Sequence, residues 1–244
     1  MVHTFFLAMA LAASAPDAGP GQGQGIGATA IVKAPEMTPE VKALVDRTQA
    51  FYEKTQDFTA TFKQDYTNKV FARTMSSTGK VTYAKATGAE PSRMRWDYDK
   101  PKGKTFLLNG EKAYFYDPEA ATLNVTNVDT SQLSASVTFL WGKGKLEKEF
   151  AITKTTCEKC AGVPLELNPL KPDPRFQKVY LEIDPKTATV LKSTVIDPEG
   201  NANVIAFNDL KTNTGIGVSK DGGVPEVFRL APPAGTQVND LTKH

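Results

Sequence analysis

An alternation of apolar and polar residues with a period of two runs through most of the chain after about residue 57, and it constrains the fold more than any other feature. Met94, Trp96 and Tyr98, for example, alternate with charged residues. Such alternation predicts strands that bury one face and expose the other. Turn sequences such as Asn109-Gly110 separate the runs, so consecutive strands are expected to pair as antiparallel hairpins.

Alternating or short apolar runs of this kind recur to the end of the chain. The expected strands are 58–63, 80–83, 93–98, 104–108, 112–116, 122–127, 149–154, 163–167, 177–183, 190–196, 204–210 and 226–230. Many short strands joined by turns indicate an antiparallel meander. The proline-rich segment 168–174 is expected to be a loop, because proline has no amide hydrogen for the interior of a sheet.

Two segments have helical periodicity instead. Thr38 is a suitable N-cap and Pro39 suits the first helical position, so a helix is predicted from there to about residues 55–57. A second helix is predicted over 131–141, where Leu133, Val137 and Leu140 would share one face.

The first 36 residues are expected to precede the folded domain. Residues 1–15 combine an apolar run with small residues, as a signal peptide does, and are too short to span a bilayer. A buried strand or short helix is the alternative, but residues 16–36 begin with a Gly-, Pro- and Gln-rich stretch typical of a flexible linker. No cysteine for lipid attachment lies near the cleavage zone. We therefore expect a soluble exported protein whose single domain covers 37–244.

Charge and composition argue against several functions. The chain has 29 basic and 27 acidic residues without a long block of either sign, so nucleic-acid binding is not expected. Its two histidines, His3 and His244, lie at the chain ends. The sequence lacks the motifs of serine hydrolases, nucleotide-binding loops and zinc proteases, and its carboxylates are scattered near turns. Neither catalytic residues, nor a metal site, nor a cofactor is predicted.

Cys157 and Cys160 form a C-x-x-C motif. A redox motif of this type begins a helix, whereas the residues that follow here do not have a helical pattern. A zinc site would need two further ligands, and the chain has no other cysteine. In an exported protein the expected result is a local disulfide that closes a hairpin loop; free thiols and redox or metal chemistry are the alternatives. Alkylation of both thiols under native conditions would contradict the disulfide.

The aromatic residues could all belong to an ordinary core. A curled sheet with few helices, however, has a concave face that the helices need not fill, and the remaining space would be a cavity for an apolar ligand. The candidate cavity residues are Phe58, Phe62, Met94, Trp96, Phe106, Leu108, Tyr114, Tyr116, Leu133, Val137 and Leu140.

Several short segments, taken in their order along the chain, match the sequence motifs of one known protein family. They are Phe58-x-Ala60-x-Phe62-x-Gln64, Gly79-Lys80-Val81, the run 94–98 between Pro91 and Pro101, the run 109–118 and the run 228–235. In order and spacing they resemble the periplasmic outer-membrane lipoprotein carrier family, LolA, over roughly residues 38–240. The resemblance implies a mainly β (α+β) fold, an unclosed antiparallel β-barrel of about eleven strands with a helical lid.

The resemblance also implies a function. A carrier of this family takes lipoproteins from an inner-membrane ABC transporter across the periplasm, with the acyl chains between sheet and lid. The implied partners are acylated lipoproteins, that transporter and an outer-membrane acceptor, and the carrier is expected to be a monomer. Each buried methylene contributes about 0.8 kcal/mol, so a lipoprotein needs such a cover to cross water.

One position departs from the family pattern. The family has a basic residue before the matched proline that holds the lid, whereas Glu90 precedes Pro91 here. Lys85, Arg93 and Arg95 are the candidates for this latch.

Three other functions are compatible with the same fold. They are a lipid-anchored lipoprotein acceptor, a sensor or regulator that binds lipids or lipoproteins, and an enzyme that acts on a small apolar substrate. The missing lipid-site cysteine argues against the first. A cavity lined only by apolar side chains would favour the carrier, and a buried cluster of acids or hydroxyls would favour the enzyme.

Overall fold

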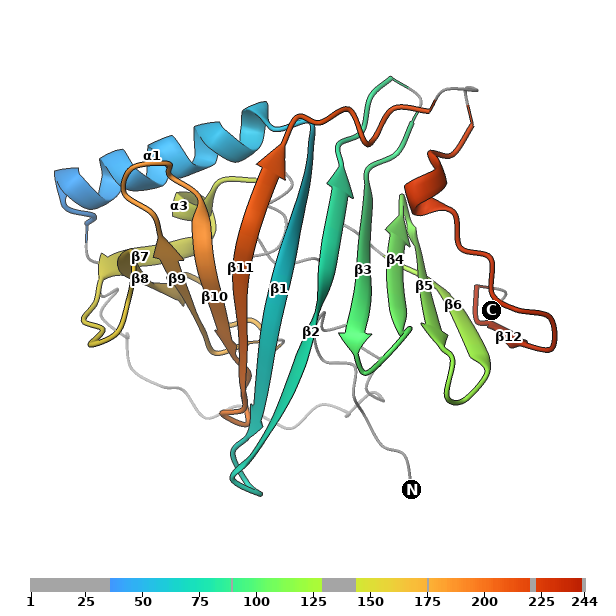
Figure 1. Ribbon diagram of the computed structural model, residues 1–244. Coiled ribbons are helices and arrows are strands. Elements are labelled where there is room, and N and C mark those ends of the chain that lie inside the picture. The colour runs from blue at the N-terminus through green and yellow to red at the C-terminus, as the bar shows by residue number, and fades with distance from the viewer. Residues whose placement is uncertain (1–35, 89, 129–143, 175, 220–222, 243–244) are drawn as a thin grey trace, which may run out of the picture.

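The computed structural model describes residues 36–88, 90–128, 144–174, 176–219 and 223–242. The predicted signal peptide, nearly all of the predicted linker and the predicted helix 131–141 lie outside these residues. The described chain forms one curled β-sheet with a long helix, α1 (Pro39–Lys54), the short helix α3 (Leu146–Glu149) and a 3-10 helix, η3 (Glu226–Phe228) (Figure 1). No helix among the described residues is both long and apolar enough to cross a membrane.

Twelve strands make up the sheet. They are β1 (Asp57–Asn68), β2 (Arg73–Ala84), β3 (Arg93–Lys100), β4 (Thr105–Asn109), β5 (Lys112–Asp117), β6 (Thr122–Asn127), β7 (Phe150–Lys154), β8 (Val163–Pro169), β9 (Lys178–Ile183), β10 (Val190–Ile196), β11 (Ala202–Thr212) and β12 (Gln237–Asp240). Their order in space is β12-β6-β5-β4-β3-β2-β1-β11-β10-β9-β8-β7. The sheet ends at β12 and β7 without closing, which confirms the predicted unclosed barrel. Every pairing is antiparallel except that of β12 with β6, which is parallel.

The amphipathic pattern of α1 explains how it is placed. The Thr38 hydroxyl caps the helix by accepting a hydrogen bond from the Val41 amide (3.3 Å), and the helix ends at Thr55. Both ends were predicted from the sequence and are confirmed. The apolar side of the helix packs with buried residues of β7–β10 in one core cluster. The Tyr52 hydroxyl accepts a hydrogen bond from the Val190 amide (3.1 Å), so the helix is also tied to β10.

The two faces of the sheet follow from the strand register. We call the face that α1 covers the inner face. In β1 it carries Phe58, Ala60, Phe62 and Gln64, which are buried and alternate with more exposed residues. The pairing of β1 with β2 and β11 carries this alternation across the sheet.

A C-terminal segment, residues 213–242 without 220–222, crosses the opposite, outer face. It leaves the end of β11, passes η3 and reaches β12 beside β6 (Figure 1). The buried Asp57 carboxylate anchors its beginning by accepting hydrogen bonds from the amides of Thr214 (2.7 Å) and Gly215 (2.8 Å). The Phe228 ring, 1% exposed, packs against Ala84 and Leu107.

Two details of the sequence prediction were wrong. The segment 226–230 is not a strand, because Pro225 begins a 3-10 turn in which the Phe228 amide donates to the Pro225 carbonyl (2.8 Å). The loop predicted over 168–174 starts two residues later, because β8 runs to Pro169. Pro169 pairs with Phe150 of β7 and has no partner in β9, so the strand accommodates its missing amide hydrogen.

Candidate apolar binding site

A cluster of apolar side chains covers the inner face of β1–β5. We call it the aromatic floor, and its predicted members are Phe58, Phe62, Met94, Trp96, Phe106 and Leu108. The structure brings these six together, and Val81 and Tyr83 of β2 and Ala113 of β5 join them. Helices α1 and α3 contribute no residue to this cluster, since α1 packs in a separate cluster over β7–β10.

Phe62 lies at the centre of the floor. It is 3% exposed, and its ring centroid lies 4.8 Å from that of Trp96 and 5.2 Å from that of Tyr98, both edge to face. The Trp96 ring also approaches that of Phe207 in β11 (6.2 Å). Edge-to-face pairs fix the orientation of the rings as well as burying them, so the floor is a packed surface.

Gly79 allows this packing. It pairs with Phe62 across the β1–β2 ladder. A Cβ atom at this position would lie 2.1 Å from the Asp97 carbonyl oxygen and 2.8 Å from the Phe62 ring. The space that any side chain would occupy is therefore filled by the Phe62 ring and the backbone of β3.

A hydrogen-bonded group of polar side chains lies at the end of the floor near Tyr98. The Tyr98 hydroxyl donates to the Gln64 side-chain oxygen (3.2 Å), and the Gln64 amide donates to Asn203 (2.9 Å). Burial raises the pKa of Tyr98 to about 12 and also raises the pKa of Tyr83. Both phenols are neutral at neutral pH, so the described floor presents no ionised side chain to a ligand.

Two of the predicted cavity residues lie on the other side of the sheet. Tyr114 pairs with Leu107 and Val125 and packs in the outer-face cluster around Phe228. Tyr116 has the same orientation, two residues further along β5. Phe115, paired with Phe106, takes the inner position. Tyr114 and Tyr116 therefore do not belong to the aromatic floor. Leu133, Val137 and Leu140 lie outside the described residues.

The three candidate latch residues have different roles. Lys85 Nζ donates to the Glu53 carbonyl in the last turn of α1 (2.6 Å). Arg93, 4% exposed, binds Glu90 (2.6 Å) and Asn109 (3.0 Å) beside the β4–β5 turn. Arg95 lies on the outer face, so only Lys85 contacts a described helix of the inner face.

Arg95 fastens the C-terminal segment instead. Its Nη1 donates to the carbonyls of Val227 (3.2 Å) and Arg229 (2.8 Å), and its Nε binds the Asp97 carboxylate. Sequence reasoning missed this role, because the partners are backbone atoms more than 130 positions away.

The Arg95→Ala variant should lose these contacts together. We expect a decrease of about 2–3 kcal/mol in the free energy of unfolding, because two carbonyls and a carboxylate lose a charged donor. The exposed Arg73→Ala is the matched control and should be within about 0.5 kcal/mol of wild type. Hydrogen exchange of residues 224–230 should accelerate in Arg95→Ala, and unchanged exchange there would contradict the anchoring role.

The cysteine pair lies away from the floor. Cys157 and Cys160 form a disulfide with their Cα atoms 5.6 Å apart. The amides of Ala161 and Gly162 just after it donate to the Glu182 carboxylate, which also pairs with Lys192 (2.7 Å). Burial by itself would raise the pKa of Glu182, but these hydrogen bonds outweigh it and lower the pKa. The disulfide and these hydrogen bonds together hold the β7–β8 loop against β9.

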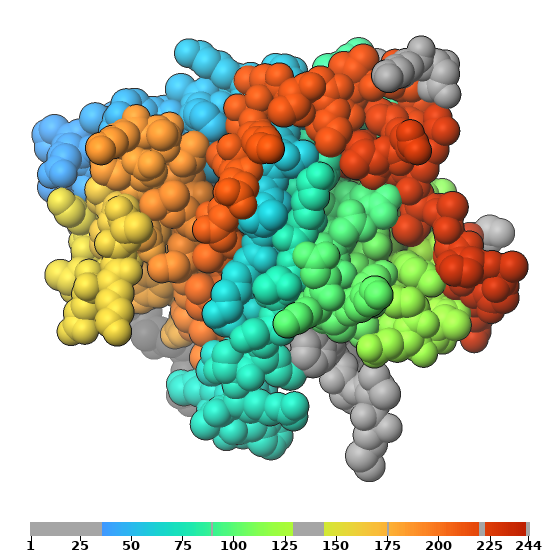
Figure 2. Space-filling view, viewed as in Figure 1, coloured from blue at the N-terminus to red at the C-terminus, as the bar shows by residue number. Residues whose placement is uncertain are grey.

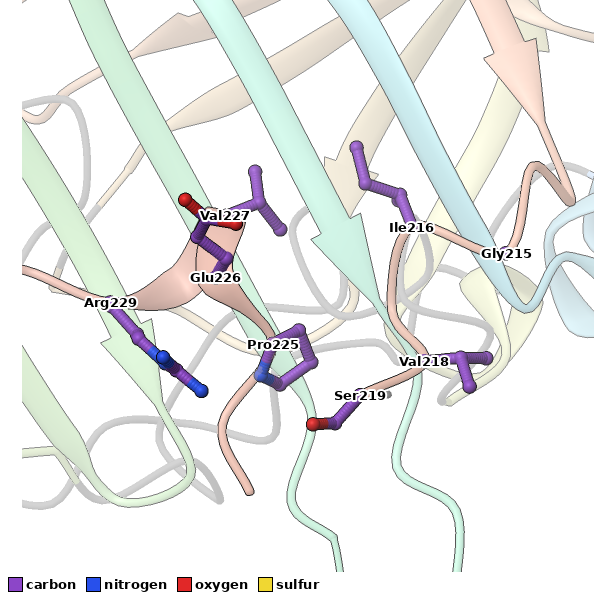
Figure 3. A pocket seen from close by; sticks show the side chains of 8 residues that line it. All are labelled: Gly215, Ile216, Val218, Ser219, Pro225, Glu226, Val227 and Arg229. Atoms are coloured by element: carbon purple, nitrogen blue, oxygen red, sulfur yellow. The ribbon is translucent and has the colours of Figure 1, made fainter. Parts of the chain in front are cut away.

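A pocket of about 710 Å³ lies in the C-terminal segment (Figure 3). Its lining residues are Gly215, Ile216, Val218, Ser219, Pro225, Glu226, Val227 and Arg229. None of them was predicted as a site residue, and nothing in the sequence of this loop distinguishes it from an ordinary connection.

An unclosed, curled sheet with an apolar inner face defines the half-barrel class of β-proteins. The family model described as outer membrane lipoprotein carrier protein LolA matches residues 53–219, more than half of the chain. The chain therefore belongs to the LolA family.

Individual relatives cover most of the chain. It is 28% identical over 195 residues to the outer-membrane lipoprotein carrier protein of Methylobacillus flagellatus, covering 80% of this chain and 87% of that one. It is 23% identical over 208 residues to the carrier protein of Nitrosomonas europaea, covering 85% and 92%. A solved LolA superfamily structure from Nitrosomonas europaea is similar at 11% identity and a TM-score of 0.36, over 74% of this chain and 97% of that one.

Proposed function

We propose that this protein is a periplasmic carrier that binds the acyl chains of lipoproteins on the aromatic floor. In this proposal it receives lipoproteins from an inner-membrane ABC transporter and delivers them to the outer membrane, without catalysing a reaction. Membership of the LolA family supports the carrier role. The floor itself supports an acyl chain as the ligand.

The chemistry of the floor is the observation that carries the proposal. Its described members are apolar or are tyrosines that stay neutral, and they come from five adjacent strands. Each methylene that leaves water for such a surface contributes about 0.8 kcal/mol, without directional contacts. The affinity for an acyl chain therefore increases with the length of the chain. Proteins that have only their acyl chains in common can then be bound by one carrier.

Two residues of neighbouring strands allow a matched test. Phe106 of β4 lies on the floor and Tyr114 of β5 lies on the outer face, and both are half-buried aromatics. The wild-type protein, isolated from the periplasm, should carry acylated species that mass spectrometry detects. Phe106→Ala should carry several-fold less, since about 2 kcal/mol or more of contact is lost, whereas Tyr114→Ala should carry as much as wild type.

Two results would contradict the carrier function. One is the recovery of no acylated species with the wild-type protein. The other is an unchanged location of lipoproteins after depletion of the protein from cells.

Release of cargo is expected to depend on Lys85. Its ammonium group holds the carbonyl end of α1, where a cation also interacts favourably with the helix dipole. Lys85→Ala should loosen this end by about 1 kcal/mol and so accelerate release of a fluorescent acyl ligand about fivefold. The control is Lys80→Ala, since Lys80 is exposed and lies in β2, the strand that ends just before Lys85. Equal release rates in wild type, Lys85→Ala and Lys80→Ala would show that Lys85 does not act as the latch.

A further inference from the structure

The β1–β2 hairpin extends beyond the rest of the sheet. The pairing of β11 with β1 stops at Thr67, and the pairing of β3 with β2 stops at Thr78. Residues 73–77 of β2 therefore have no neighbouring strand on the side where β3 pairs with the rest of β2, a length of about 17 Å for the five residues at 3.4 Å each. Figures 1 and 2 show the teal tip of this hairpin as the lowest projection of the described chain.

The tip exposes two large apolar side chains. Val70 is 79% exposed and Phe71 is 78% exposed. Lys69 and Arg73 flank them, and no ion pair joins either cation to a carboxylate in the described part of the chain. Exposed apolar side chains next to cations without a carboxylate partner are compatible with the interface of an anionic bilayer, where the apolar groups leave water and each cation is attracted to the headgroups.

Hydrogen bonds hold the tip in this extended position. The Phe71 amide donates to the Asn68 side chain (2.9 Å), and the hydroxyls of Thr67 and Thr74 are 2.8 Å apart across the ladder. The Lys69 amide donates to Asn201 in the β10–β11 turn (2.9 Å). Because the backbone is fixed in this way, exposure of Val70 and Phe71 does not have to be created when a partner arrives.

We propose that the β1–β2 tip is a membrane-docking finger. Val70 and Phe71 enter the interfacial layer of a lipid bilayer, and Lys69 and Arg73 contact its anionic headgroups. Two side chains and two charges give weak, reversible attachment, which suits a protein that must leave the membrane again. The inference does not depend on the aromatic floor, since the tip lies outside the floor cluster.

Vesicle flotation of the full-length mature protein tests this proposal. The probe is a protein-free vesicle of phosphatidylethanolamine with about one quarter phosphatidylglycerol. Wild-type protein should float with the vesicles at about 50 mM salt and mostly dissociate at about 300 mM, because salt screens headgroup attraction. Val70→Ser/Phe71→Ser should reduce the partition coefficient at least tenfold. Lys69→Gln/Arg73→Gln should reduce it about 25-fold, at about fivefold per cation.

Val218→Ser is the matched control, because Val218 is 73% exposed but lies in the C-terminal segment. It should float like wild type, and all variants should keep the thermal midpoint of wild type, since every replaced side chain is at the surface. Phe106→Ala should also float normally, so a failure of cargo binding is distinguishable from a failure of docking. The proposal is overturned if the wild-type protein does not float, if the tip variant floats like wild type, or if Val218→Ser loses as much. Binding only to vesicles that contain a membrane protein would also overturn it, in favour of a protein partner.

Discussion

Phe62→Ala is expected to lower the free energy of unfolding by about 3–5 kcal/mol, which is the range for removing a fully buried phenylalanine. The Phe62 ring is 3% exposed and contacts both Trp96 and Tyr98 edge to face. Its removal leaves a cavity in the middle of the floor, and two other rings lose their orientation with it. Urea unfolding should show a lower midpoint with an unchanged slope.

Phe71→Ala is the matched control for this measurement. The same residue type is removed from the same hairpin, but the Phe71 side chain is 78% exposed. Its free energy of unfolding should stay within about 0.5 kcal/mol of wild type. Similar losses in the two variants would mean that the floor is not a packed surface. Because Phe62 also contributes to the proposed acyl site, Phe62→Ala should carry less lipid at temperatures where it remains folded.

Gly79→Ala is expected to cost about 3 kcal/mol or more, at the upper end of the range for overpacking. The added methyl group would lie 2.1 Å from the Asp97 carbonyl oxygen and 2.8 Å from the Phe62 ring. A ring can rotate, but a carbonyl oxygen can move only with the backbone of β3. The thermal midpoint should fall accordingly, and near-UV circular dichroism should report disturbed packing of Trp96.

Gly88→Ala separates steric from conformational cost. Gly88 has a φ of +57°, and no heavy atom lies within 4 Å of its hypothetical Cβ. An alanine there should cost only about 1 kcal/mol, from backbone strain. In the Phe62→Ala background, Gly79→Ala should become less harmful but not neutral, because the Asp97 oxygen remains in place. If Gly79→Ala did not change the free energy of unfolding in that background, the backbone of β3 would move easily to accept the added methyl group.

The parts of the fold that the sequence predicts are those that local physics determines. The start of α1 follows from Thr38 and Pro39, because capping and proline geometry act within one turn. Six floor residues were placed together correctly because period-two alternation assigns each strand residue to a face. The prediction fails at Tyr114 and Tyr116 because three aromatic residues follow one another in β5, so alternation gives no preference for either face.

Other features depend on contacts that no local pattern encodes. Strand β12 is short and polar, and it forms only because the C-terminal segment reaches the edge of β6. The role of Arg95 depends on where η3 lies, and η3 itself replaces a predicted strand because Pro225 starts a turn. The β1–β2 hairpin is likewise longer than the predicted strands, since residues 64–68 and 73–79 show weaker apolar alternation than their neighbours.

The route of the C-terminal segment has a mechanical consequence. It is fastened at Asp57 near the middle of the sheet, at Arg95 in β3 and along the edge of β6. A tie of fixed length across the convex side of a curved sheet goes into tension when the curvature increases, and slackens when the sheet flattens. These attachments are therefore expected to resist a further increase in the curvature of the sheet and to permit its flattening.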